Sequence, residues 1–299
     1  MKIEKIDTFA GHRDGVYALV KANTEHEFFS AAGDGQVVRW NLQKPDLGEL
    51  IARVPASVYA IAFDHTRNQL WVAQNFEGIH LINPDTKEEI NSIKITSSAI
   101  FDIKLHENNA FIGTNDGTII VMDIVAFAVK KHLKASDKSV RSMAINPISN
   151  ELAVGYSDFL IKIFDLQDFS LKLVIDAHLN SVFTVCYSTD YQFLLSGSRD
   201  AHLKIWSVSD YQLQQDIVAH LFAINSIVFS PDGKHFATCS MDKAIKVWDA
   251  KTFKLLKVID KARHAGHGTS VNKLYWSNFQ NLLLSGSDDK MISVWTIDE

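Results

Sequence analysis

An internal repeat of about 42 residues is the feature that most constrains the fold of this chain. One copy begins at His178, passes through the run Ser196-Gly197-Ser198-Arg199-Asp200 and ends at Trp206. The same residue types return about 42 positions later, in a copy that ends at Trp248-Asp249. Self-similarity of this length indicates one supersecondary unit stacked several times, because a single unit cannot bury its apolar face alone. The repeat therefore outweighs any local reading of secondary structure.

About seven such units account for the 299 residues of the chain. When the copies are aligned on the position of Trp206, at the end of the unit, that position holds Trp40, Ile82, Met122, Phe164, Trp206, Trp248 and Trp295. We therefore expect one closed domain over residues 1–299. Its units are expected at about residues 15–54, 57–95, 99–134, 139–176, 181–218, 223–260 and 270–298.

Each unit has the patterning of β-strands. Leu203-Lys204-Ile205-Trp206 and Ile161-Lys162-Ile163-Phe164 alternate with period two and are rich in β-branched residues, as half-buried strands are. Asp34-Gly35 and Pro231-Asp232-Gly233 are typical of tight turns between strands. Helical periodicity of useful length is absent from the sequence, so an all-β fold is predicted.

Composition and charge limit the classes of protein to consider. The chain is 46% hydrophobic and 22% charged, which is typical of a globular protein, and its net charge of −5 argues against direct contact with nucleic acid. The N-terminus lacks the apolar core of a signal peptide, and no apolar run approaches the ~18 residues that span a bilayer. Cys186 and Cys239 fall in apolar strand patterns and are expected to be buried, reduced thiols. We expect a soluble cytoplasmic protein without membrane insertion.

Short motifs make the chain resemble the WD40-repeat family over essentially its whole length. They are Gly11-His12, Gly266-His267, Trp248-Asp249 and the Ser-Gly-Ser-x-Asp runs at 196–200 and 285–289. The resemblance implies a seven-bladed β-propeller of four-stranded antiparallel blades around a central channel. The last repeat ends one strand short, whereas residues 2–9 form a spare strand. We expect residues 2–9 to complete the last blade, since this pairing would remove exposed sheet edges.

The resemblance also implies a structural role for a His, a Ser or Thr, an Asp and a Trp in each repeat. In the family these four side chains form a buried hydrogen-bonded chain, here called the tetrad. It is complete in four repeats, as His12, Ser30, Asp34 and Trp40; His178, Ser196, Asp200 and Trp206; His220, Thr238, Asp242 and Trp248; and His267, Ser285, Asp289 and Trp295. The second to fourth repeats lack the His and the Trp. We expect them to rely on apolar packing alone and to open first.

The start of each first strand carries the sharpest functional signal. Apolar residues recur there at offsets zero, three and five, as in Val140, Met143 and Ile145. Offsets zero and three can share a strand face only if an extra residue intervenes, so a β-bulge is predicted. The family resemblance places this bulge at the mouth of the central channel. The residues at offset one, hereafter the bulge residues, are Tyr17, Tyr59, Phe101, Arg141, Phe183, Asn225 and Asn272.

Aromatic and Arg side chains dominate protein-binding hot spots, so the bulge residues are the predicted partner-binding site. The alternative for any one aromatic ring is packing against a neighbouring blade as part of the core. Further candidates directly precede the turn Asp of a repeat: Asn115, Ser157, Arg199, Met241 and Asp288, of which Arg199 and Met241 are included in the predicted site. A basic cluster entering the fourth repeat could meet an acidic peptide or simply be a solvated strand face; it comprises Lys130, Lys131, Lys134, Lys138 and Arg141.

The sequence therefore predicts a non-enzymatic scaffold that binds protein or peptide partners. If it binds several partners at once, it would be part of a multiprotein complex. It contains no phosphate-binding loop, Cys-x-x-Cys pair, nucleophile elbow or His-Glu-x-x-His motif. His264 and His267 lack a nearby Cys or carboxylate in their segment, so neither a metal nor a cofactor is expected. Two alternatives remain open: a propeller enzyme that uses Asp102, Arg141 and the His264 loop on a small molecule, and a chromatin-associated or nucleic-acid-associated adaptor.

Overall fold

The computed structural model describes residues 1–298, and of residue 46 only the backbone. The described residues form seven four-stranded antiparallel sheets. Six sheets take four consecutive strands in sequence order, and the seventh has the order β1-β28-β27-β26. The chain divides into two compact units. Unit 1 comprises residues 1–94 and the chain from Val228 onward, and unit 2 comprises residues 95–227.

Unit 1 begins with β1 (Lys2–Ala10). Its first full sheet has β2 (Val16–Lys21), β3 (Glu27–Ala32), β4 (Gln36–Asn41) and β5 (Lys44–Arg53). Its second has β6 (Ala60–Asp64), β7 (Gln69–Gln74), β8 (Gly78–Ile82) and β9 (Glu89–Lys94). Further along the chain lie β23 (His235–Ser240), β24 (Ile245–Asp249), β25 (Leu255–Ile259), α1 (Lys261–His264), β26 (Val271–Trp276), the 3-10 turn η1 (Phe279–Asn281), β27 (Leu283–Ser287) and β28 (Met291–Asp298).

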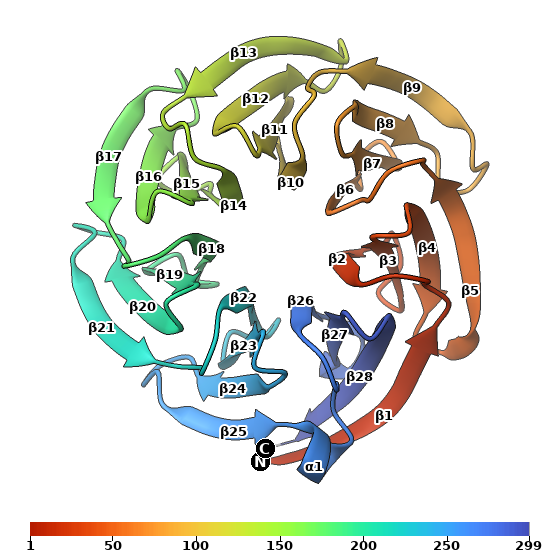
Figure 1. Ribbon diagram of the computed structural model, residues 1–299, viewed down its shortest axis with the longest axis vertical. Coiled ribbons are helices and arrows are strands. Elements are labelled where there is room, and N and C mark those ends of the chain that lie inside the picture. The colour runs from red at the N-terminus through yellow and green to blue at the C-terminus, as the bar shows by residue number, and fades with distance from the viewer. Residues whose placement is uncertain (299) are drawn as a thin grey trace. The chain divides into compact units, whose positions relative to one another are not determined.

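Unit 2 contains three consecutive sheets. They are built from β10 (Ile100–His106), β11 (Asn109–Thr114), β12 (Thr118–Asp123) and β13 (Ala128–Lys134); β14 (Val140–Asn146), β15 (Glu151–Tyr156), β16 (Leu160–Asp165) and β17 (Leu171–Asp176); and β18 (Val182–Tyr187), β19 (Phe193–Ser198), β20 (His202–Ser207) and β21 (Leu213–Val218). β22 (Ile224–Phe229) contains the boundary to unit 1. Within unit 2, the first strand β14 packs against both β10 and β18, so the starts of three sheets lie side by side (Figure 1).

Burial changes systematically across each sheet. The second strand is almost wholly buried, as in β19, where Leu194 and Leu195 are inaccessible to solvent. The fourth strand is mostly exposed, as in β9. A strand covered on both faces reads as a continuous apolar run, which explains Phe193-Leu194-Leu195 in the sequence. The two cysteines differ in the same way: both are free thiols, but Cys239 on the second strand β23 is buried and Cys186 on the first strand β18 is only partly buried.

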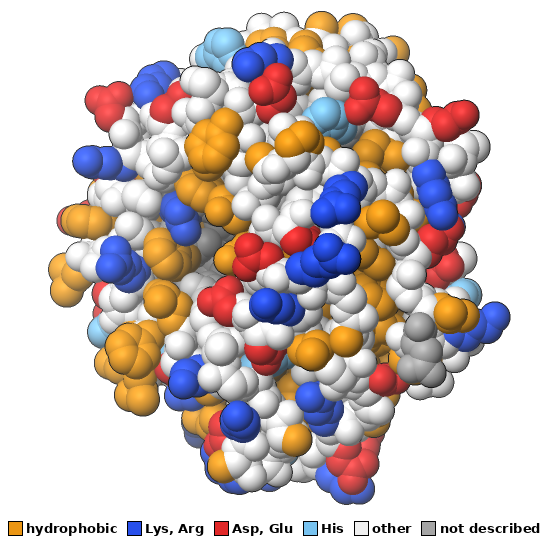
Figure 2. Space-filling model, turned by 45° about the vertical axis from the view of Figure 1, so that its right-hand side comes forward, with side chains coloured by type: hydrophobic (Ala, Val, Ile, Leu, Met, Phe, Trp, Pro, Cys, Tyr) orange, Lys and Arg blue, Asp and Glu red, His pale blue; other side chains and the backbone are white. Residues whose placement is uncertain are grey.

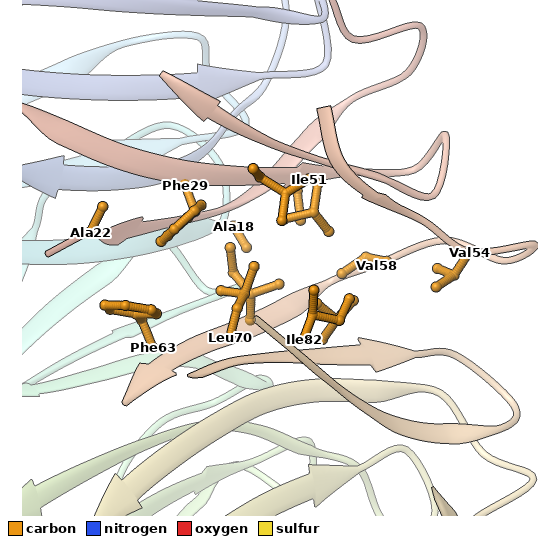
Figure 3. Close-up of a cluster of buried hydrophobic side chains, with 13 residues drawn as sticks. Ala18, Ala22, Phe29, Ile51, Val54, Val58, Phe63, Leu70 and Ile82 are labelled. Carbon is orange, nitrogen blue, oxygen red and sulfur yellow. The ribbon is translucent and has the colours of Figure 1, made fainter. Parts of the chain in front are cut away.

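Apolar side chains from neighbouring sheets interdigitate to form the core. Figure 3 shows one such cluster in unit 1, where Phe29 of β3 lies near Phe63 of β6 and the ring centroids are 5.2 Å apart. Leu70 of β7 and Val58 are fully buried in the same cluster. Each sheet alone would expose one such face. The free energy gained by burying apolar surface therefore comes from the packing of neighbouring sheets.

β1 completes the sheet of β26 to β28. It pairs antiparallel with β28 from Lys2 opposite Asp298 to Ala10 opposite Met291. Phe9 is buried and packs edge-to-face on Phe28 and Trp40, with ring centroids 5.5 and 5.3 Å away. The prediction that residues 2–9 close the last sheet is confirmed.

The predicted β-bulge is present in five of the first strands. The pairing register shifts by one residue between Val16 and Ala18, Ile100 and Asp102, Val140 and Ser142, Val182 and Thr184, and Val271 and Lys273. In each case the residue skipped is the bulge residue. A bulge leaves that residue outside the ladder and re-aims its side chain, as the apolar spacing indicated.

No helix in the described part of the chain is long and apolar enough to cross a membrane.

Candidate partner-binding surface

All seven bulge residues are partly buried. A partly buried side chain is neither a packed core residue nor a freely solvated one, and it has both a fixed position and an accessible face. The structure therefore gives these residues the partial exposure that a binding anchor needs.

A backbone hydrogen bond holds each bulge close to the neighbouring turn. The N–H of Arg199, directly before the turn Asp, donates to the carbonyl of Ser181, two residues before Phe183, at 2.9 Å. Asn115 donates in the same way to Ala99, at 2.8 Å. The same bond recurs from Ser157 to Ser139 and from Asp288 to Ser270. The residues before the turn Asp and the bulge residues therefore adjoin within each of these sheets.

Three bulge residues of unit 2 form a stack. The guanidinium carbon of Arg141 lies 4.3 Å from the ring centroid of Phe101 and 4.4 Å from that of Phe183. The three residues come from the starts of β10, β14 and β18, the first strands that lie side by side. A guanidinium attracted to two ring faces gains cation–π energy on both sides. The stack therefore holds a long, flexible side chain in one orientation.

Hydrogen bonds between backbone N–H groups and side-chain oxygens join the neighbouring first strands that carry the stack. Oδ2 of Asp102, next to Phe101, accepts a hydrogen bond from the backbone N–H of Met143 at 2.7 Å. Its Oδ1 accepts from Lys104 Nζ at 3.1 Å. Ser142 accepts from the N–H of Val185 at 3.2 Å in the equivalent place. Both carboxylate oxygens of Asp102 are thus engaged: Oδ2 joins β10 to β14, and Oδ1 pairs with Lys104 of the same strand.

The bulge residues of unit 1 form a more polar cluster. The rings of Tyr17 and Tyr59 meet edge-to-face with centroids 4.9 Å apart. Asn272 donates to Oδ1 of Asp288 at 2.7 Å and to the carbonyl of Val16 at 3.3 Å. Burial, reinforced by the Asp288 carboxylate, raises the pKa of Tyr17 to about 12. Tyr17 is therefore a neutral phenol and a hydrogen-bond donor at physiological pH.

The remaining predicted residues lie outside these two clusters. Asn225 lies on β22 in unit 2 and is partly buried, whereas Met241 follows β23 in unit 1 and is exposed. Arg199 is exposed beside Phe183. His264, named in the enzyme alternative, belongs to α1 in unit 1. No group of three or more His, Cys, Asp or Glu side chains that could hold a metal ion occurs among residues 1–298.

Three exposed apolar residues in unit 2 were not predicted from the sequence. Leu179 and Leu221, each directly after a tetrad His, are 86% and 82% exposed, and Phe222 is 60% exposed. The backbone N–H of Leu179 donates to Oδ2 of Asp200 at 2.9 Å, which places it beside Arg199. The signal was available, since the equivalent position holds Arg13 in the first repeat and Gly268 in the last.

Comparison with known proteins decides the family. The family described as "WD domain, G-beta repeat" matches residues 3–41, 127–165, 169–207, 211–249 and 258–296, more than half of the chain. The chain belongs to the WD40 family.

The chain is also similar to two known proteins. The WD40 β-propeller domain of Doa1, a crystal structure, superposes with a TM-score of 0.87 over 99% of this chain and 98% of that chain, at 16% identity. The chain also matches the WD repeat-containing protein SL1-17 of Schistosoma mansoni, with 24% identity over 147 residues. This second match spans 48% of either protein. The fold is therefore the seven-bladed β-propeller with four-stranded antiparallel blades, as predicted, and each sheet is one blade.

The predicted WD40 tetrad residues are hydrogen-bonded to one another. In the fifth blade, Trp206 donates to the Ser196 hydroxyl at 2.9 Å, this hydroxyl lies 2.8 Å from His178 Nε2, and His178 Nδ1 lies 3.1 Å from Asp200. If Nδ1–H donates to the carboxylate, Nε2 accepts the Ser proton, so the chain is satisfied with a neutral imidazole.

The other WD40 tetrads share most of this arrangement. Trp40 and His12 lie 2.7 Å from the Ser30 hydroxyl, but His12 Nδ1, 3.4 Å from Asp34, makes no hydrogen bond within the described residues. Trp295 and His267 lie 2.9 and 2.8 Å from that of Ser285, with His267 2.8 Å from Asp289. Trp248 donates to Thr238 at 3.0 Å, in the blade that also contains His220 and Asp242.

The expectation of apolar packing alone is wrong for the fourth WD40 repeat. Lys162 is only 4% exposed, and its ammonium group donates to Asp158 at 2.8 Å and to the carbonyl of Ala135 at 2.7 Å. It also lies 4.4 Å from the ring centroid of Tyr156. Ser136, at the position of the tetrad His, donates to the same Asp158 oxygen at 2.6 Å. A Lys-Asp-Ser network thus replaces the tetrad, because a buried polar group needs partners.

The WD40 tetrads should make the protein acid-sensitive. Burial lowers the pKa of His12 and of His178 below the usual 6.5. Burial opposes ionisation of Asp200, yet the hydrogen bond from His178 holds the pKa of Asp200 below 3.8. Below about pH 6.5 the unfolded state therefore binds more protons than the folded state, and stability falls with pH; Asp200 adds a further loss at lower pH. We expect a lower urea midpoint at about pH 5 than at pH 7.5.

The control is a His12→Asn, His178→Asn variant, which should be less stable but show a smaller change between the two pH values. An equal urea midpoint for the wild type at both pH values would contradict this assignment.

Proposed function

We propose that this WD40 protein is a non-enzymatic interaction module that binds partner protein segments through its bulge residues. WD40 propellers are typically protein-interaction scaffolds, and the chain shares their fold. The observation that carries the proposal is the Phe101–Arg141–Phe183 stack. It offers two aromatic side chains and an Arg, the residue types that dominate hot spots, on three adjacent strands.

Preorganisation is the physical reason why such a stack suits binding. Immobilising a flexible side chain at an interface costs about 0.5 to 1.5 kcal/mol. Arg141 is already held between two rings, and Asp102 and Ser142 hold the strands that carry them. A partner would therefore meet a rigid anchor and would lose little conformational entropy in ordering it.

The enzyme alternative has less support from the geometry. Of its three named groups, Asp102 is 9% exposed and both of its oxygens accept hydrogen bonds from Met143 and Lys104. A general base must reach the substrate proton, so a carboxylate in this position suits a strand clamp better than catalysis.

Direct nucleic-acid binding also has little support. A phosphate backbone requires a basic face. The face drawn in Figure 2 instead mixes basic, acidic and hydrophobic side chains, and the chain carries a net charge of −5.

Affinity capture from the native source tests the proposal. The wild type is compared with a Phe101→Ala, Phe183→Ala variant, after the melting curve has shown that the variant folds. We expect the wild type to retain partner proteins that the variant loses. The matched control is Ile148→Ala, because Ile148 is 75% exposed in the turn at the other end of β14 from Arg141. Retention of the same partners by all three proteins would place binding elsewhere.

A further inference from the structure

A mixed basic and apolar patch adjoins the stack in unit 2. It consists of Lys138, Arg141, Leu179, Phe183 and Arg199, and we call it the blade 4–5 patch. Lys138 lies in the loop that enters β14, two residues before Val140. Arg141 lies on the ring of Phe183, 4.4 Å from its centroid.

Two hydrogen bonds donated by backbone N–H groups place Arg199 and Leu179 near Phe183. The N–H of Arg199 donates to the carbonyl of Ser181 at 2.9 Å, close to Phe183 in sequence. The N–H of Leu179 donates at 2.9 Å to Asp200, the neighbour of Arg199. Arg141, Phe183, Leu179 and Arg199 thus lie close to one another, and Lys138 precedes Arg141 by three residues in the chain. Leu179 provides an apolar side chain that is 86% exposed.

The carboxylates of these loops are engaged by other side chains. Asp158 pairs with Lys162 at 2.8 Å, Asp137 with Lys134 at 3.4 Å, and Asp200 lies 3.1 Å from His178. The exposed side chains of Lys138 and Arg199, by contrast, have no carboxylate partner anywhere in residues 1–298. The blade 4–5 patch is therefore positively charged at a protein surface whose net charge is negative.

We propose that the blade 4–5 patch binds a peptide segment of a partner in which an Asp or Glu lies close to a large apolar residue. The inference rests on the proposed function and names the chemistry of the partner. The rings cover both faces of the Arg141 guanidinium, so a carboxylate approaches along its edge, where the N–H groups form charge-assisted hydrogen bonds. Arg199 and Lys138 add charge, and the apolar side chain of the peptide packs on Leu179.

An acidic peptide fits the patch better than a nucleic acid, the other common polyanion. Leu179 and the exposed Leu221 and Phe222 of the next loop would stay uncovered against a phosphate backbone. Apolar surface exposed beside charged groups is instead typical of protein interaction sites.

A peptide selection on the full chain tests the inference. A phage library of random 12-residue peptides is selected on the wild type, and the enriched peptides are synthesised and measured by fluorescence anisotropy. We expect enrichment in Asp or Glu next to Leu, Ile or Phe. Affinity should fall at least about tenfold in an Arg199→Gln, Lys138→Gln variant, and also for peptides with Asn or Gln in place of the acids. An Ile148→Ala variant is the control and should bind as the wild type does.

The outcomes separate the inference from the proposed function. Enriched peptides without acidic residues that still require Phe101 and Phe183 would overturn the acidic-peptide inference and leave the proposed function standing. A library that yields no peptide, or peptides that bind Arg199→Gln, Lys138→Gln as tightly as the wild type, would also overturn the inference. The same applies if a fluorescent single-stranded oligonucleotide binds the patch and the peptides do not.

Discussion

Asp158→Ala should destabilise the protein by about 3 to 5 kcal/mol, because it leaves the buried ammonium group of Lys162 without its carboxylate. Replacing both partners, as Lys162→Met with Asp158→Asn, should recover most of this loss, since an apolar side chain of similar size removes the buried charge. Urea unfolding measured by fluorescence compares the three proteins.

The matched control uses the equivalent lysine of the next blade. Lys204 occupies the position of Lys162 in the repeat. Its ammonium group lies 3.5 Å from Asp216, and the side chain of Asp216 is 38% exposed. Asp216→Ala should therefore cost no more than about 1 kcal/mol. An Asp158→Ala variant that is as stable as Asp216→Ala would show that the Lys162 network contributes little.

Deletion of residues 2–9 should abolish cooperative unfolding and cause aggregation. Without β1, the whole length of β28 becomes an exposed edge, which can pair with another chain. The deletion also removes Phe9 from its contacts with Phe28 and Trp40. Calorimetry and light scattering check the result.

Point substitutions separate packing from edge protection. Phe9→Ala should cost about 3 to 5 kcal/mol while it leaves the strand paired. Ile6→Ala is the control, because Ile6 lies at the register shift of β1 and is 49% exposed; it should cost no more than about 0.5 kcal/mol. A truncated protein that melts as cooperatively as the wild type would contradict the closing role of β1.

The fold could be predicted because each repeat carries the same local information. Strand alternation, turn residues and apolar offsets recur in most of the repeats, so a repeat in which one signal is weak can be interpreted from the others. The shift between Val140 and Ser142 was visible as an apolar spacing that a regular strand cannot accommodate. The pairing of residues 2–9 with β28 followed from one strand missing at one end and one spare at the other.

Lys162 could not be placed from the sequence. Ile161-Lys162-Ile163 and Leu203-Lys204-Ile205 have the same pattern, yet one lysine is buried and the other only partly so. The difference depends on a distant substitution, Ser136 in place of a tetrad His, and on Asp158, which Ser136 and Lys162 share. Such a network depends on side-chain positions in three dimensions, which periodicity does not record.

The candidate site could be predicted only as a series of positions. The sequence indicated that Phe101, Arg141 and Phe183 occupy equivalent positions about 40 residues apart, but not that the guanidinium lies between the two rings. Leu179 escaped notice because an apolar residue in a strand-rich chain is normally assigned to the core.

Site-specific photocrosslinking tests the central claim, that partners bind at the bulge residues, most directly. A photoreactive amino acid replaces Ser157, whose N–H bonds to Ser139 beside Arg141, and in a second protein it replaces Ile148 at the opposite end of β14. Crosslinking is carried out in extracts of the native source. The account predicts crosslinked partner proteins from position 157 that are absent from position 148 and are lost when Phe101→Ala and Phe183→Ala are added. Partners that crosslink only from position 148, or that persist without the two aromatic rings, would contradict it.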